Sequence, residues 1–207
     1  DNGPWLSKNK KHADGHLPSD QGGSAGPLRS GKVSTFEGGV RVPAILWAPG
    51  RVPAATTCNE IASTLDILPT FAALAGAEAP TDRVIDGEDI RHLFHGDFDE
   101  ANPDKTYFYY LRGQLQAVRQ GKWKLILVRE SDTFQGRINK HIAPADRAGP
   151  KEPFLVDLEK DLGETTSTAS RNPMVVEHLL ALAEAMRKDL GDGDRFGENM
   201  RFFDPRP

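Results

Sequence analysis

A glycine-rich stretch over residues 22–43 constrains this chain more than any other segment. It contains six of the chain's 20 glycines and one lysine, Lys32. Glycines at this density let the backbone adopt positive φ and approach a ligand closely, and a lysine ammonium offers three donors to an anionic oxygen. Residues 40–47 are apolar and rich in β-branched side chains, which predicts a buried strand. We therefore expect a glycine-rich loop that carries a cation and leads into a strand.

Composition excludes several classes of function. The net charge is −4 over 207 residues, and no cluster of lysine and arginine provides a surface for nucleic acid. No apolar run reaches the length of a membrane span, so we expect neither a nucleic-acid nor a membrane partner. The single cysteine, Cys58, rules out an internal disulfide. The chain opens on the turn-forming sequence Asp-Asn-Gly-Pro without a methionine, so we expect it to be part of a longer chain whose targeting signal lies elsewhere.

The pattern of elements changes near residue 100. Before it, residues 66–75 are predicted to form a helix that ends at Gly76, and with the preceding strand this gives one step of an α/β layer. An acidic segment, 96–105, indicates a domain boundary. After it, the sequence predicts an antiparallel sheet and one strong amphipathic helix. The expected strands are 106–111, 115–119, 123–128 and 154–158, and the helix covers 173–190. We therefore expect two domains, 1–98 and 106–207.

Two pairs of residues are candidates for metal binding. Asp1 and Asn2 offer hard oxygen ligands, which suit Ca²⁺ or Mg²⁺ better than zinc, but calcium takes about six to eight ligands and Asp-Asn-Gly is also a common turn. His12 and His16 are four residues apart. A glycine between them and a proline after them oppose a helix, which favours a solvated loop over a zinc site.

Glu37 and Arg41 flank the Gly38-Gly39 pair and are expected to form an ion pair that braces the turn. A cation-binding turn and a lysine on a glycine-rich loop together describe a site for an oxyanion, in which metal and lysine share the charge of a tetrahedral group.

Several motifs, in order, resemble the C-terminal half of the arylsulfatase family. They occupy residues 1–4, 23–32, 36–43, 63–70, 85–87 and 154–165. The resemblance implies an alkaline-phosphatase-like α/β fold followed by a small α+β subdomain with an antiparallel sheet and a C-terminal helix. It also implies hydrolysis of sulfate esters by a formylglycine hydrate, with calcium as cofactor.

The resemblance assigns roles to three residues. Asp1 and Asn2 would be two of the calcium ligands, and Lys32 would be the catalytic residue that contacts the sulfate. The family's nucleophile arises in a Cys/Ser-x-Pro-x-Arg motif, which is absent here, and the sequence after Cys58 does not fit it. The chain is therefore expected to carry part of a metal site, to lack formylglycine, and to be inactive alone.

The expected substrate is a sulfate ester of a small molecule or a sulfated glycan, and the resemblance implies a periplasmic or secreted protein. A homo-oligomer stays open. Two alternative functions also stay open: a phosphatase or phosphonate hydrolase of the same superfamily, and a binding or dimerisation module without catalysis.

Overall fold

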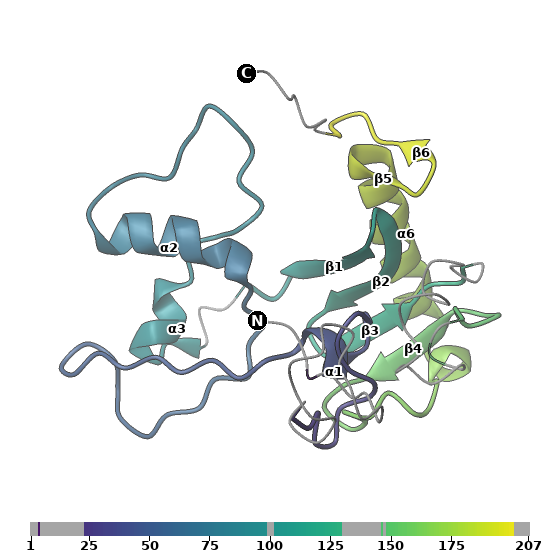
Figure 1. Ribbon diagram of the computed structural model, residues 1–207, viewed down its shortest axis with the longest axis horizontal. Helices are drawn as coiled ribbons and strands as arrows, with labels where there is room; N and C mark the ends of the chain where they lie inside the picture. The colour runs from purple at the N-terminus through teal and green to yellow at the C-terminus, as the bar shows by residue number, and fades with distance from the viewer. Residues whose placement is uncertain (1–3, 5–22, 99–101, 130–145, 147, 201–207) are drawn as a thin grey trace, which may run out of the picture. The chain divides into compact units, whose positions relative to one another are not determined.

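The computed structural model describes residue 4 and residues 23–98, 102–129, 146 and 148–200 (Figure 1). These fall into two compact units, one formed by the chain up to Pro43 together with the chain from Thr106, and the other by Ala44–Lys105. The predicted metal ligands Asp1 and Asn2 lie outside the described residues, as do His12 and His16. The expected division into domains 1–98 and 106–207 stays a prediction.

A four-stranded antiparallel sheet forms the centre of the first unit, which confirms the predicted strands. Its strands are β1 (Thr106–Leu111), β2 (Gln114–Gln120), β3 (Trp123–Ile126) and β4 (Phe154–Asp157), in the spatial order β1-β2-β3-β4. β2 and β3 are joined by a tight turn at Gly121, whose φ of 54° lies in the left-handed region that glycine tolerates.

The pairing of β1 with β2 contains a bulge. Tyr109 pairs with Ala117, but its neighbour Tyr110 pairs with Leu115, so β2 has Gln116 as an extra residue. A bulge re-aims the side chains around it. As a result, Leu115 packs in the core on one face of the sheet and Ala117 packs in the core on the other.

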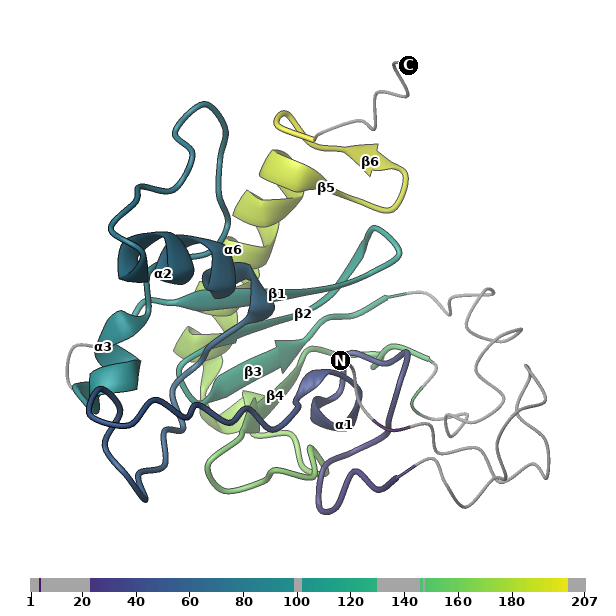
Figure 2. The same cartoon turned by 60° about the vertical axis from the view of Figure 1, so that its left-hand side comes forward.

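Helix α6 (Pro173–Leu190) covers one face of the sheet, as Figures 1 and 2 show. Proline occupies its first turn, where the missing N–H costs little, and Gly191 ends it with a φ of 91°. The buried core on this face comprises Leu115, Val118, Leu125, Leu127, Leu155, Leu179 and Ala183. A short 3-10 turn, η3 (Ala169–Arg171), precedes α6, and the small hairpin β5–β6 (Gly191–Asp192 and Arg195–Phe196) follows it.

The chain before Pro43 covers the opposite face with the short helix α1 (Glu37–Val40). Phe36, which precedes the helix, is buried against Tyr109, Ala117 and Ile126. The two faces of the sheet are therefore covered by segments from opposite ends of the chain.

The predicted strand over 40–47 is wrong. Val40 ends α1, and residues 41–48 have no regular structure. Ile45 is 94% exposed and Trp47 is 84% exposed, so these side chains are not buried either. A strand needs a neighbour to accept its hydrogen bonds, and none of the described strands pairs with this segment.

The second unit is small and helical. It contains the 3-10 turn η1 (Thr64–Asp66), α2 (Ile67–Leu74) and α3 (Arg91–His95). The predicted helix after Asp66 is confirmed, although the capping bonds belong to Ser63, whose hydroxyl accepts the N–H of Leu65 while the Asp66 carboxylate accepts the N–H of Ser63 at 2.7 Å.

The Asp66 carboxylate, which is 2% exposed, also lies 2.9 Å from Lys105 Nζ. This ion pair joins the start of η1–α2 to the end of the second unit. None of the helices in the described part of the chain has the length and apolar character needed to cross a bilayer.

Candidate functional site

Lys32 lies on a turn with an unusual backbone. Its side chain is exposed, and its backbone N–H donates to the carbonyl of Pro4 at 2.9 Å. Ser30 and Val33, on either side of it, have φ angles of 64° and 68°. A β-branched residue such as valine is a clear outlier in this region, and each such residue costs on the order of 1–3 kcal/mol. Residues 29–36, hereafter the Lys32 loop, therefore keep this conformation only because their surroundings impose it.

The Gly38-Gly39 pair brings α1 directly against the Lys32 loop. Gly38 N–H donates to the carbonyl of Arg29 at 2.9 Å. A Cβ atom on Gly38 would collide with the backbone oxygens of Arg29 and Ser30, and one on Gly39 would collide with that of Ser34. Any side chain at these positions would push α1 away from the loop, so the two segments are packed backbone against backbone.

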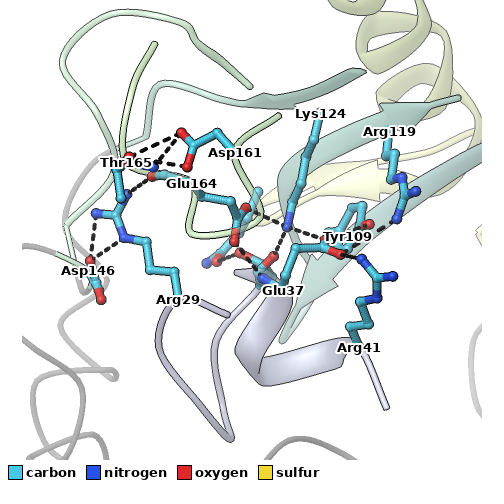
Figure 3. A network of polar contacts seen from close by, with 12 residues as sticks. Arg29, Glu37, Arg41, Tyr109, Arg119, Lys124, Asp146, Asp161, Glu164 and Thr165 are labelled. Carbon is cyan, nitrogen blue, oxygen red and sulfur yellow. Dashed lines mark hydrogen bonds and ion pairs between the residues drawn. The ribbon is translucent and has the colours of Figure 1, made fainter. Parts of the chain in front are cut away.

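A buried lysine from β3 reaches the same place from the sheet. Lys124 is 0% exposed, and its Nζ lies 2.7 Å from the carbonyl oxygen of Thr35, 2.9 Å from Glu37 Oε1 and 2.8 Å from Glu164 Oε1. Figure 3 shows the ammonium between the two carboxylates. It is also 4.4 Å from the centre of the Tyr109 ring. We call Thr35, Glu37, Lys124 and Glu164 the Lys124 network.

Glu37 is the member of the network that belongs to α1. Its backbone N–H donates to Glu164 Oε2 at 2.6 Å, and its own Oε2 lies 3.5 Å from Arg119 and 3.9 Å from Arg41. The predicted pair of Glu37 with Arg41 is confirmed, but it is the longest of these contacts. The sequence reasoning missed the shorter contacts with Lys124 and Glu164.

The two carboxylates of the network differ in pKa. Burial tends to raise the pKa of Glu37, but the charge and hydrogen bond of Lys124, helped by Arg119 and Arg41, outweigh it and lower that pKa. Burial raises the pKa of Glu164, and Lys124 offsets this only in part. Burial and the charge of Glu37 raise the pKa of Tyr109, so its phenol stays protonated. Glu37 is therefore the firmly ionised partner of Lys124.

Arg29 holds the start of the Lys32 loop. Its guanidinium donates to Asp146 Oδ1 at 2.6 and 2.8 Å and to the carbonyl of Glu164 at 2.5 Å. The same group lies 4.2 Å from the centre of the Phe36 ring. Glu164 thus contacts the chain at both ends of the Lys32 loop. Its carbonyl accepts from Arg29 at the start of the loop, and its carboxylate accepts from the backbone N–H of Glu37 directly after the loop.

Of the predicted site residues, the structure places only Lys32. Among the described residues, no three His, Cys, Asp or Glu side chains come together in a way that could hold a metal ion. Cys58 is a free, exposed thiol in the second unit.

Two family models cover most of the chain. The C-terminal region of aryl-sulfatase matches residues 102–204, and the C-terminal region of N-sulphoglucosamine sulphohydrolase matches residues 31–137. The chain is 37% identical to mouse steryl-sulfatase over 82% of its length and 35% identical to human arylsulfatase A over 86%. These alignments cover 29% and 36% of the two relatives, so the chain spans about a third of their length.

Solved structures show the same fold. The chain superposes on Ps i-CgsB, solved in complex with a neocarrahexaose, with a TM-score of 0.62 and 26% identity, covering 87% of this chain and 36% of that one. A Pseudoalteromonas sulfatase, PsFucS1, gives a TM-score of 0.66 at 21% identity, covering 89% of this chain and 35% of that one. The expected α/β fold with an antiparallel C-terminal sheet is thereby confirmed. The two sulfatase models together span residues 31–204, and the match to residues 31–137 alone covers just over half of the chain, so the chain belongs to the arylsulfatase family and corresponds to the C-terminal portion of such a protein.

Proposed function

We propose that the full-length protein containing this chain hydrolyses sulfate esters, with Lys32 as the catalytic residue that binds the sulfate. The observation that carries the proposal is the exposed Lys32 on a loop whose backbone is held in a rare conformation. Such strain is typical of ligand-binding positions. An ammonium group at this point donates to the anionic oxygens of a sulfate and stabilises the charge they bear during attack on sulfur.

The hydrogen bond between Lys32 and Pro4 supports a shared site with Asp1 and Asn2. The carbonyl of Pro4 accepts the Lys32 N–H at 2.9 Å. Pro4, which follows the proposed metal ligands in the sequence, thus contacts the backbone of the Lys32 loop, and this supports the proposal of a shared site.

The donor set of Asp1 and Asn2 fits calcium, because carboxylate and amide oxygens are the ligands this cation prefers. A bound calcium would supply positive charge to the sulfate oxygens and orient the ester. The remaining ligands and the formylglycine nucleophile would come from outside this chain, since the chain has no Cys/Ser-x-Pro-x-Arg motif. The substrate class in this proposal is a sulfate ester of a small molecule or of a glycan.

The test compares the full-length protein with its Lys32→Ala variant on an aryl sulfate and on the matching aryl phosphate. We expect calcium-dependent turnover of the sulfate, lowered by at least about a hundredfold in the variant, as for other donors to a developing oxyanion. Lys160→Ala is the matched control, because Lys160 is a lysine in the first unit with 78% of its side chain exposed. Zinc-dependent turnover of the phosphate alone would replace this proposal with the phosphatase alternative.

A further inference from the structure

We propose that Lys124 and Glu164 are positioning residues for Lys32, and that they act by holding Glu37 and thereby α1 beneath the Lys32 loop. This inference rests on the proposed function of Lys32. It assigns a role in sulfate binding to two buried residues of the C-terminal sheet region that never touch the substrate themselves.

The Lys32 loop needs external support. Ser30 and Val33 both have positive φ, so the loop left to itself would relax. Its contacts with the backbone of α1 leave no space for a side chain at Gly38 or Gly39. The position of α1 therefore determines which conformations the loop can adopt, and a displacement of α1 moves Lys32.

The helix α1 cannot hold its own position. It is a single turn of four residues, and isolated helices of this length are unstable in water. Its buried side chain is Glu37, 1% exposed, whose carboxylate and backbone N–H are bound by Lys124 and Glu164. Lys124 projects from β3, an inner strand of the sheet, and groups on such elements are held more precisely than groups on loops.

The position of Glu37 also depends on the balance of charges inside the network. Two buried carboxylates face one buried ammonium, and Arg119 and Arg41 approach Glu37 from its other side. Without Lys124, Glu37 and Glu164 would repel each other at the point where they now share a cation. The carboxylates would separate, and α1 would move with Glu37.

The experiment uses the full-length protein with Lys124→Met, and Glu164→Gln as a second variant if the first does not fold. Arg187→Met is the matched control, because it breaks a 2.7 Å ion pair with Asp192 beside α6, which covers the other face of the sheet. Each variant is made with and without Lys32→Ala. The measurements are kcat and KM for an aryl sulfate, the free energy of unfolding, and hydrogen exchange of the peptide covering residues 28–36.

We expect Lys124→Met to lower kcat/KM by about a hundredfold, the size of effect seen when a reacting group is misplaced by about 1 Å. In the Lys32→Ala background the same change should cause no further loss of activity, although it still lowers stability. The peptide covering 28–36 should exchange faster. Arg187→Met should lower the free energy of unfolding. Any loss of kcat/KM that it causes should add to the loss caused by Lys32→Ala.

Two results would overturn the inference. Unchanged exchange of residues 28–36 in a folded Lys124→Met or Glu164→Gln protein would show that the network does not hold the loop, whether or not the protein hydrolyses sulfate. Losses of activity that add to that of Lys32→Ala would show that the network does not act through Lys32. Failure of the proposed function has a different signature, which is full activity in Lys32→Ala or no sulfate turnover by the unmodified protein.

Discussion

Lys124 is a charged residue at a position of β3 that sheet geometry assigns to the interior. In β3, Lys124 and Ile126 point to one face of the sheet and Leu125 points to the other, and Leu125 and Ile126 are both buried. A lysine is retained in such a place only when carboxylates neutralise it. Glu37 and Glu164 do this from segments 87 and 40 residues away in the sequence.

Replacing Lys124 with methionine should lower the free energy of unfolding of the 207-residue chain by about 3–5 kcal/mol, because two buried carboxylates lose their cation. The double change Lys124→Met with Glu164→Gln should recover part of this loss, since only one buried charge then remains. Urea unfolding followed by circular dichroism measures both, and Lys160→Met is the exposed control. A double variant less stable than Lys124→Met would contradict the charge argument.

Glu164 should make stability depend on pH. Because its pKa is raised in the folded state, the folded chain binds a proton that the unfolded chain has released, so its contribution is full below pH 4.5 and is lost as pH rises through the folded pKa. Glu164→Gln removes this dependence, so the difference in unfolding free energy between wild type and variant should shrink as pH rises.

Urea unfolding between pH 4.5 and 8 checks the prediction, with the exposed Glu152→Gln as control. Glu37 contributes the opposite slope, since its pKa is lowered, and it remains in both proteins. A difference that grows with pH would show that Glu164 is ionised more easily in the folded state.

At the scale of elements, α6 shows how a single face stabilises the first unit. Leu179 is 1% exposed in the core against the sheet, whereas its neighbour Leu180 is 36% exposed. Leu179→Ala should lower the free energy of unfolding by about 2–5 kcal/mol through the cavity it leaves. Leu180→Ala should change it much less, and thermal or urea unfolding of the two variants distinguishes them. Equal effects would mean that α6 does not pack as described.

The elements that the sequence predicts well are those whose own residues carry the signal. The four strands and α6 show strong periodicity, and all of them form. The helix also has a proline at its start and Gly191 at its end. The segment 40–47 has an equally apolar pattern but does not form a strand, because strand formation depends on a pairing partner that the described chain does not provide.

Only part of the candidate site could be predicted from the sequence, for a similar reason. Lys32 stands out because glycines surround it, and Glu37 pairs with Arg41 at a local spacing of four residues. The link from Glu37 to Lys124 and Glu164 depends on which strands meet and on the bulge in β2, which no local pattern reveals. The only available signal was the lysine between apolar residues in β3, at a position expected to face the core.

At the scale of the whole molecule, the second unit has many uncovered apolar side chains. Besides Ile45 and Trp47, α2 leaves Leu68 52% and Phe71 55% exposed. Exposed apolar surface of this extent is typical of interaction sites. We expect amides over residues 44–75 to exchange faster than those of β1–β3 in the 207-residue chain, and to gain protection in the full-length protein. Equal protection of 44–75 in a monomer of the chain alone would contradict this.

The 207-residue chain alone should not hydrolyse an aryl sulfate, because it has no Cys/Ser-x-Pro-x-Arg motif to supply the nucleophile. A chromogenic aryl sulfate measures this directly, with the full-length protein as positive control. Turnover by the chain that disappears in Lys32→Ala would mean that the nucleophile lies within these residues.

The Lys124 network also limits how such proteins can be recombined. Glu37 precedes the second unit, while Lys124 and Glu164 follow it, so an exchange of sequence anywhere between Pro43 and Thr106 separates Glu37 from both of its buried partners. A hybrid made at that junction would combine a loop from one parent with the support of another. Crossovers before residue 29 or after Glu164 keep the loop and its support in one parent, and these should yield working chimaeras.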